Sequence, residues 1–506
     1  MKFDILNADR NYPEKGGRKM IFRKITALLL TLVTACSVLC ACGSERGNGG
    51  SGLVEDNPDE HVKLVWYIRS SEPQGFKEVM EEANKQLKEK LNVTLDLRCV
   101  ESGDYNSKLQ LAAASGEEFD LVWTASWAND YEGNVTKNAF LDITDYLELP
   151  ELKYIRNLYR DGVWDACRIN GKIYAVPVEQ VIYDQRGIWF IKSYMEKYGI
   201  NPYEKLKTTD DLEDIYQTVH DGEPDLIMCT GGNRIWAEGS SGVVSGFSID
   251  KHGNITDMED KKDFGLEWNI RMRNWNQRGF FPADIATFSE EDSYIKQGKI
   301  LSRYGRYLLG SEGKTRITNG YDVNHVPISD KLITRTGVQT TLTAVSFTSK
   351  HPMRALKLIQ LMHEDADLLN LICYGLEGRD YTKDPENPHR INRESSGYYI
   401  SEYMIGSQFL AYLVPSYEDG VWEQTKKENE EADIDPYIGF SFDRNPVKTE
   451  IANVSAVGEE YKGLGVGLYE DVESTYAEMA EKRRKAGYDI IREEIERQFK
   501  EWQNEQ

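Results

Sequence analysis

The folded part of the chain opens with alternating strand-like and helix-like patterns of hydrophobic positions. Residues 62–68 form an apolar, β-rich run, and residues 76–91 then place apolar side chains at helical spacing. The period changes to two immediately afterwards, since Val93, Leu95 and Leu97 alternate with polar residues. This order predicts a strand–helix–strand unit, which is usually right-handed with parallel strands.

A further helix and strand continue the alternation. The helix is expected over about 105–114 and ends at Ser115 and Gly116, and a strand follows at 119–124. Strands and helices that alternate in this way predict an open α/β sheet, in which ligands gather at the carboxyl ends of the strands. Here those ends lie at residues 67–71 and 123–127.

The N-terminal region has the layout of an export signal. Basic residues precede the nearly uncharged run 25–41, and a small residue stands before Cys42. The pattern resembles the bacterial lipoprotein signal, in which the cysteine is diacylated, so Cys42 is the expected lipidation site. A transmembrane anchor or a cleaved signal without lipid are the alternatives, but the run is only marginally long enough to span a bilayer. Acidic residues precede Met20 and do not fit a signal, so translation is expected to start at Met20.

Composition narrows the possible partners. The 506 residues carry a net charge of −23, which argues against nucleic acid as a partner. Beyond Cys42 the remaining cysteines lie far apart in sequence, so no disulfide framework is expected; they are Cys99, Cys167, Cys229 and Cys373. No run after residue 42 is long and apolar enough for a membrane span. Residues 43–60 are rich in Gly, Ser and Asn, which predicts a flexible tether.

Motifs along the rest of the chain, taken in order, resemble those of the extracellular solute-binding proteins of ABC importers. They are KLQL at 108–111, FDLVW at 119–123, GKIYAVP at 171–177, SKHP at 349–352, YGLEGRDY at 374–381 and NPVKTEIANV at 445–454. The arrangement is similar to the large, LipO-like, carbohydrate-type branch, in which a distinct C-terminal module follows the core. That module ends in a helical pattern with one apolar face, made of Ile491, Ile495, Phe499 and Trp502.

The resemblance implies an α/β, two-lobe fold of the periplasmic-binding-protein type II. Each lobe is then an open, mainly parallel sheet flanked by helices, and a helical C-terminal extension follows. Crossing strands join the lobes, and the solute binds in the cleft between them. The expected divisions are a signal peptide at 1–42, a tether at 43–60, lobe one at 61–180 plus 340–385, lobe two at 181–339 plus 386–436, and a C-terminal module at 437–506 packed on lobe two.

Aromatic residues near strand ends are the first candidates for a ligand site in lobe one. The chain has ten Trp and twenty-nine Tyr, and sugar rings stack their apolar faces on such side chains while their hydroxyl groups take polar partners. The candidates are Trp66, Tyr67, Arg69, Ser70, Glu72, Ser126, Trp127 and Tyr131, with Asp130 as a further hydrogen-bonding group nearby. Core packing is the alternative interpretation for the aromatic residues among them, above all for Trp66 inside its strand.

Three further pairs of candidates lie later in the chain: Arg234 and Trp236, Arg303 and Tyr304, and Glu377 and Arg379. For the first pair a structural turn with a packed Trp is the alternative. For the second pair the alternative is a surface salt bridge. The third pair belongs to a glycine-rich loop that either reaches the hinge side of the cleft or only caps a helix.

Signatures of enzymes are incomplete in this sequence. The stretch GSEGKT at 310–315 ends like a phosphate-binding loop but has Leu308 where the first glycine is required. The stretch HEDAD at 363–367 lacks the second histidine of a zinc-protease helix, and no Gly-x-Ser-x-Gly elbow occurs. Glu117 and Glu118 could serve a glycosidase, but adjacent acids ahead of a strand more often form a solvated turn. Carboxylates are abundant enough to leave a metal site open as an alternative, but no spacing in the chain demands one. Because the enzyme signatures are incomplete, we expect a non-enzymatic protein without a cofactor.

The sequence therefore predicts an extracellular solute-binding protein that is tethered to the cell membrane by lipid, in a Gram-positive type of bacterium. It is expected to be a monomer that captures a carbohydrate, preferably an oligosaccharide, and delivers it to the permease subunits of an ABC transporter. Two alternatives stay open at this point. One is a secreted lipoprotein glycoside hydrolase, and the other is a sensory subunit that passes closure to a receptor kinase.

Overall fold

The computed structural model describes residues 53–232, 241–257, 265–393 and 397–505. The predicted signal peptide, the lipidation candidate Cys42 and the site candidates Arg234 and Trp236 lie outside these residues. Within the described ranges, no helix combines the length and the apolar character that a membrane crossing requires.

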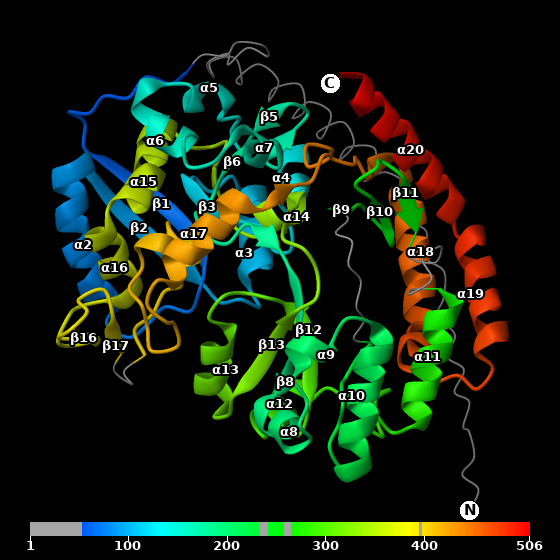
Figure 1. The fold of residues 1–506 in the computed structure, drawn as a ribbon. Helices are drawn as coiled ribbons and strands as arrows, with labels where there is room; N and C mark the ends of the chain where they lie inside the picture. Colours follow the sequence, from blue (N-terminus) through cyan, green and yellow to red (C-terminus); the bar gives the residue numbers. More distant parts are fainter. Residues whose placement is uncertain (1–52, 233–240, 258–264, 394–396, 506) are drawn as a thin grey trace, which may run out of the picture. The chain divides into compact units, whose positions relative to one another are not determined.

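A five-stranded mixed sheet organises the first lobe (Figure 1). Its strands, in spatial order, are β2 (Val93–Val100), β1 (Val62–Arg69), β3 (Leu121–Thr124), β15 (Leu342–Val345) and β6 (Ala175–Pro177). The first three strands are mutually parallel, and β15 runs antiparallel to both of its neighbours. The predicted parallel strand–helix–strand unit is confirmed, with α2 (Phe76–Leu91) as its helix.

The helices of this lobe bury the faces that the sequence pattern predicts. Helix α2 buries Val79, Met80, Ala83 and Leu87, which share one face at helical spacing. Two later helices, α15 (Pro352–Glu364) and α16 (Ala366–Tyr374), pack against α2. Helix α15 starts with a proline, which suits the first turn because that position needs no donated hydrogen bond.

The second lobe is built on a three-stranded sheet in the order β12 (Ser302–Arg306), β8 (Arg186–Ile191), β13 (Val323–Pro327). Both pairings with β8 are antiparallel, whereas a mainly parallel sheet was expected. The sheet is antiparallel because β8 lies between β12 and β13 and runs opposite to both. Strands β12 and β13 run parallel to each other and are connected through α13 (Ser311–Asn319). Helix α10 (Thr209–Gly222) supplies Leu212, Ile215, Tyr216 and Val219 to the core of this lobe.

Three short crossing strands connect the parts of the molecule. They form a sheet in the order β18 (Asp433–Ile434), β14 (Leu332–Ile333), β7 (Tyr183–Asp184). Strands β7 and β14 lie between the two lobes in the chain order, and β18 leads from α17 (Val421–Glu431) to the C-terminal module. The crossing strands expected from the resemblance are therefore present.

The stretch 386–436 was expected in lobe two, but several of its described core residues lie with the first lobe. Ile391, Ile400, Met404, Ile405 and Ala411 belong to the same hydrophobic cluster as β1 and β3. The stretch is held there by backbone contacts with lobe one, for example from the Ile400 amide to the carbonyl oxygen of Cys373 (2.9 Å).

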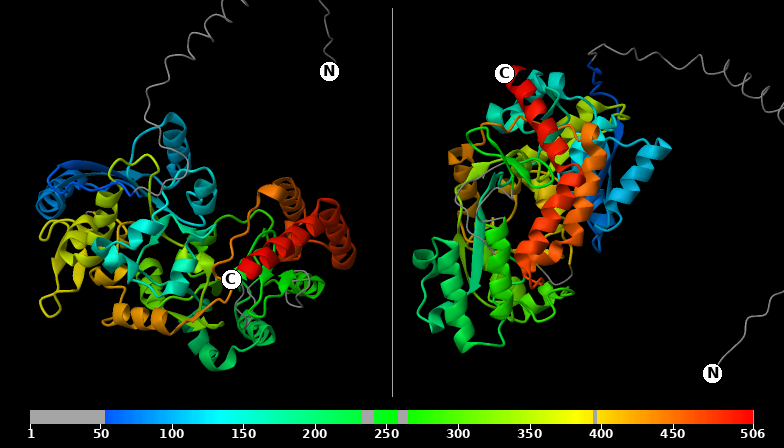
Figure 2. Two further views of the ribbon diagram at one scale, coloured as in Figure 1. Left: turned by 90° about the horizontal axis from the view of Figure 1, so that it is seen from above. Right: turned by 90° about the vertical axis from the view of Figure 1, so that its right-hand side faces the viewer.

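The C-terminal module consists mainly of three helices, α18 (Lys448–Glu460), α19 (Val472–Lys485) and α20 (Tyr488–Glu505) (Figure 2). Helix α20 buries Ile491, Ile495 and Phe499, as the spacing predicts. The module contacts α11 (Leu266–Gln277), where Arg273 donates to the carbonyl oxygen of Gly467 (3.1 Å).

The segment just before β1 is docked on the first lobe. Asp56 forms ion pairs with Arg354 (3.0 Å) and Lys357 (2.9 Å) of α15, and the Arg354 side chain is only 2% exposed. Residues 53–60 were expected to belong to the flexible tether. Asp56 within them is instead anchored, because its carboxylate is the counter-charge of the buried Arg354 guanidinium.

Candidate functional site

The strand register places the loop after β3 at the edge of lobe one from which the chain crosses to lobe two. Leu342 is paired with both Thr124 and Pro177, so the carboxyl ends of β3 and β6 meet at one edge of the sheet. From this edge the chain runs on after Pro177 into the crossing strand β7. Ligands of open α/β sheets bind at the carboxyl ends of the strands, so a ligand site is expected at this edge.

Trp127 in this loop is an exposed aromatic side chain with a fixed orientation. Its side chain is 53% exposed, yet its indole nitrogen donates to the carbonyl oxygen of Thr340 (2.8 Å). The ring packs edge-on against the buried Trp123, with centroids 5.3 Å apart, and the Arg69 guanidinium lies 5.0 Å from its centroid. An aromatic ring that is half-exposed and fixed in orientation can stack against the apolar face of a sugar ring.

A small cavity of about 100 Å³ lies beside the same loop. Lobe one lines it with Ser126, Asp130 and Glu132, and residues of α14 (Arg335–Val338) and the adjoining Gln339, which lie just before β15, add further walls. Other walls come from β9 (Ser241–Gly242) with its neighbours and from the stretch 437–444. The cavity has room for several water molecules or for one end of a polar ligand.

The polar groups of this cavity are held in position by lobe one. Arg335 is 8% exposed; it forms an ion pair with Glu132 (2.8 Å) and donates to the carbonyl oxygen of Arg168 (2.9 Å). Gln339 is also buried and donates to the carbonyl oxygen of Ala166 (2.8 Å). Fixed donors and acceptors beside an aromatic platform suit a ligand with many hydroxyl groups.

Three of the predicted site residues are buried in the core of lobe one. Trp66, Tyr67 and Tyr131 are at most 1% exposed, and the Tyr131 hydroxyl donates to the carbonyl oxygen of Cys167 (2.6 Å). The Tyr67 hydroxyl donates to Glu117 (2.6 Å), and burial together with this carboxylate raises the Tyr67 pKa. These rings offer no free face to a ligand, so we leave them out of the proposed site.

The other predicted residues of lobe one are Arg69, Ser70, Glu72, Ser126 and Trp127. Arg69, Ser126 and Trp127 come together at the edge described above. Ser70 and Glu72 follow β1, where the Ser70 hydroxyl donates to the carbonyl oxygen of Ser71 (3.1 Å) and Glu72 is exposed.

The remaining described candidates are not brought to this cavity. Arg379 pairs with Asp380 (2.6 Å) and contacts the loop after β1, and Glu377 pairs with Lys383 (3.1 Å). In lobe two, Arg303 pairs with Glu291 (3.6 Å), while Tyr304 packs against the core of that lobe. The surface salt bridge weighed as the alternative for Arg303 is thus present.

Several residues of the cavity were missed by the sequence analysis, namely Glu132, Arg335, Gln339, Phe440, Phe442 and Arg444. They come from segments separated by more than a hundred residues, so no local spacing marks them as neighbours. The one available signal was the pattern FSF at 440–442, two aromatic residues around a serine where the C-terminal module begins.

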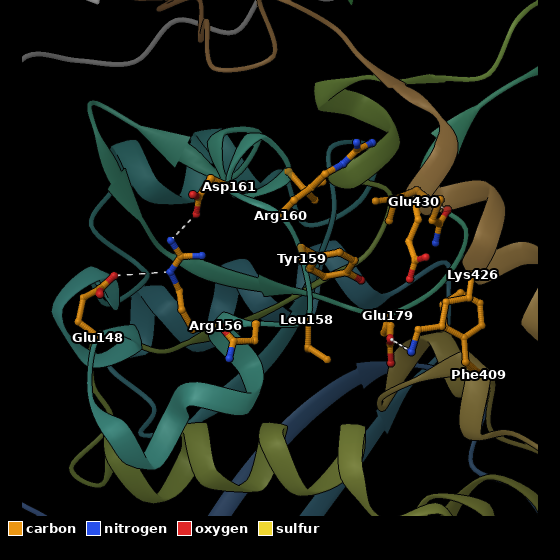
Figure 3. A pocket seen from close by; sticks show the side chains of 14 residues that line it. Glu148, Arg156, Leu158, Tyr159, Arg160, Asp161, Glu179, Phe409, Lys426 and Glu430 are labelled. Atoms are coloured by element: carbon orange, nitrogen blue, oxygen red, sulfur yellow. Dashed lines mark hydrogen bonds and ion pairs between the residues drawn. The ribbon is translucent and has the colours of Figure 1, made fainter.

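A second and larger cavity of about 690 Å³ lies on lobe one beside α17 (Figure 3). Several of its charged groups are already ion-paired, since Arg156 pairs with Asp161 (2.6 Å) and Lys426 with Glu179 (3.6 Å). Its walls come from the first lobe and α17, so lobe closure would not enclose a ligand there. Among the residues that the structure describes, no cluster of His, Cys, Asp and Glu is arranged to hold a metal ion.

Comparisons with known proteins agree with this architecture. Residues 69–269 match the family model of the bacterial extracellular solute-binding proteins, and residues 436–504 match a domain of unknown function, DUF3502. A carbohydrate ABC transporter substrate-binding protein from Streptococcus pneumoniae serotype 4 is 25% identical over 500 residues, which cover 95% of this chain and 98% of the relative.

Solved structures show the same fold. The N-glycan transport solute binding protein NgtS from Streptococcus pneumoniae superposes with a TM-score of 0.78 at 24% identity, over 88% of this chain and 100% of that chain. The same protein in complex with Man5GlcNAc gives a TM-score of 0.67 at 23% identity, over 88% of this chain and 99% of that chain. The predicted resemblance and the predicted two-lobe fold are confirmed, and a separate C-terminal module follows the core as expected.

Proposed function

We propose that this protein, which has the two-lobe fold of the bacterial extracellular solute-binding proteins, captures a neutral oligosaccharide and delivers it to the permease of an ABC transporter. The observation that carries the proposal is the fixed, half-exposed indole of Trp127 at the sheet edge from which the chain crosses to lobe two. The carbohydrate-binding relatives support the ligand class, and Man5GlcNAc is the first probe to use because a relative binds it.

Binding would shift an equilibrium between open and closed lobes. Glu428 of α17 is placed to connect the crossing strands, since it accepts from the Tyr183 hydroxyl (2.5 Å) and pairs with Lys331 (2.9 Å). Burial alone would raise the pKa of Glu428, but the hydrogen bonds from Tyr183, Gln424 and Lys331 outweigh it and lower the pKa. These contacts couple α17 to the crossing strands, which act as the hinge in this proposal.

We propose that the protein releases its ligand unchanged. A glycosidase needs two carboxyl groups that face the scissile bond. Two carboxyl groups, those of Asp130 and Glu132, line the cavity beside Trp127, and the second is ion-paired with the buried Arg335. Intact recovery of the oligosaccharide after incubation would support a binding protein, and a shortened product would support the hydrolase alternative.

For the cellular arrangement we propose a lipid anchor on Cys42, with translation from Met20 and a monomeric body on the outer face of the membrane. Mass spectrometry of the mature N terminus tests the anchor, because a diacylated Cys42 is expected. We also propose the predicted division into two lobes and a C-terminal module, with 386–431 moved to lobe one because several of its core residues lie there.

Deletion of the gene separates an importer from a sensor. An importer mutant should lose uptake of the labelled oligosaccharide, and a copy of the gene should restore it. Unchanged uptake with a lost transcriptional response to the sugar would support the receptor-kinase alternative.

A further inference from the structure

The cavity beside Trp127 has one wall that belongs to the C-terminal module. Phe440 and Phe442 line the cavity and are also part of the module's own hydrophobic core. The Phe440 ring packs against Phe499 of α20, with centroids 5.2 Å apart. This wall is therefore a fixed surface of the module and not a loose linker.

Polar contacts hold the start of the module against lobe one at the cavity. Arg335, which is ion-paired with Glu132, donates a long hydrogen bond to the carbonyl oxygen of Ile438 (3.5 Å). The Ser441 hydroxyl donates to Glu132 (3.5 Å). The module thus meets lobe one at the cavity, although its helices pack against α11 and β10 (Phe247–Ile249).

Two opposite charges line the cavity from its two sides. Asp130 comes from the loop after β3, and Arg444 comes from the module. Neither side chain forms an ion pair with any residue in the described part of the chain. A carboxylate accepts hydrogen bonds and a guanidinium donates them, so together they match a pair of sugar hydroxyl groups, which do both. An ionic ligand would be repelled by one of the two.

We propose that the C-terminal module forms one wall of the carbohydrate site, in which Arg444 and Phe442 of the module and Ser126 and Asp130 of lobe one hold one neutral sugar unit. The inference rests on the proposed function, and it assigns a ligand-binding role to the domain of unknown function at 436–504. The next sugar unit would stack on Trp127, since Ser126 and Trp127 are adjacent.

The test is calorimetric titration of the full chain with Man5GlcNAc. Arg444→Gln is expected to weaken binding about tenfold, because a hydrogen bond from a charged group to the ligand is lost. Arg497→Gln is the matched control, since Arg497 is an exposed arginine of the same module that pairs with Glu494 and Glu501 and does not line this cavity. The control should bind like the wild type.

Asp130→Asn provides a second variant on the opposite wall, and the double variant tests whether the two residues hold the same sugar. The combined loss should be smaller than the product of the single losses, because each substitution already releases that sugar. If Arg444→Gln binds Man5GlcNAc as tightly as Arg497→Gln does while Trp127→Ala binds it more weakly, the module has no role in binding. That result would overturn this inference but leave the proposed site at Trp127 in place. Absence of saturable binding by the wild type would overturn the proposed function itself, and this inference with it.

Discussion

The indole nitrogen of Trp127 donates a hydrogen bond to the carbonyl oxygen of Thr340 (2.8 Å), although 213 residues separate the two in sequence. The bond joins the loop after β3 to the segment that enters β15, so it fixes the ring at the edge of lobe one. An exposed indole normally samples several orientations, and each would have to be given up when a ligand binds. The contact with Thr340 removes most of that entropic cost in advance.

Trp127→Ala is therefore expected to weaken oligosaccharide binding by tenfold or more, since a fixed Trp at the centre of an interface typically contributes about 2 kcal/mol. The melting temperature should change little, because the side chain is 53% exposed. Phe347→Ala is the matched control: this aromatic residue is 56% exposed and lies outside the cavity. Equal affinities of Trp127→Ala and Phe347→Ala for the oligosaccharide would contradict the proposal that the ligand stacks on Trp127.

Gly133→Ala tests whether the position of Asp130 matters. A Cβ atom on Gly133 would lie 2.1 Å from the nearer carboxylate oxygen of Asp130, so the aspartate side chain must move away. The backbone of Gly133 is not left-handed, so alanine is tolerated there without strain. We expect weaker oligosaccharide binding in titration calorimetry with an unchanged melting temperature. Wild-type affinity would show that the Asp130 carboxylate does not contact the ligand.

The local patterns predicted the secondary structure of lobe one because they depend on neighbouring residues only. The spacing of Val79, Ala83 and Leu87 identified α2, and the apolar face of Ile491, Ile495 and Phe499 identified α20. Both predictions are confirmed, since a buried helical face imposes the same period wherever it packs.

The site was predicted less well, because position at a strand end does not determine which side chains remain open. Trp66 and Tyr67 point to opposite faces of β1, and helices or loops cover both faces. Trp127 lies beyond its strand and stays exposed. Contacts such as that between Glu132 and Arg335 join residues 203 positions apart, which no pattern in the sequence reveals.

Asp56→Asn should destabilise the protein at neutral pH. Burial alone would raise the pKa of the Asp56 carboxyl, but the hydrogen bonds from Arg354 and Lys357 outweigh it and lower the pKa. The substitution leaves the buried Arg354 without its counter-charge, which costs about 3 kcal/mol. Chemical denaturation at pH 7 measures this difference.

The same difference should shrink under acid conditions. A carboxyl group whose folded pKa is lowered stabilises the fold above its unfolded pKa of 3.8, and the contribution disappears as the pH falls through the folded value. Asp59→Asn, a nearby exposed aspartate, serves as the control and should match the wild type. A pH-independent deficit in Asp56→Asn would contradict the ion-pair explanation.

His325 should make the fold sensitive to mild acid. Burial lowers the pKa of His325 to about 4, despite the nearby Glu312 carboxylate. Below the unfolded pKa of 6.5 the unfolded chain binds a proton that the folded protein excludes, so stability falls by up to about 3 kcal/mol between pH 6.5 and pH 4. His325→Gln should flatten this part of the stability profile relative to the wild type. Parallel profiles would show that His325 is not the titrating group.

Titration of Man5GlcNAc into the chain from residue 53 onward, which forms one compact unit, is the most direct test of carbohydrate capture. Calorimetry should show saturable heat with a stoichiometry near one, and chromatography of the mixture should return the oligosaccharide intact. Sustained heat together with a cleaved product, or no heat at all, would contradict the proposed capture of this oligosaccharide by a binding protein.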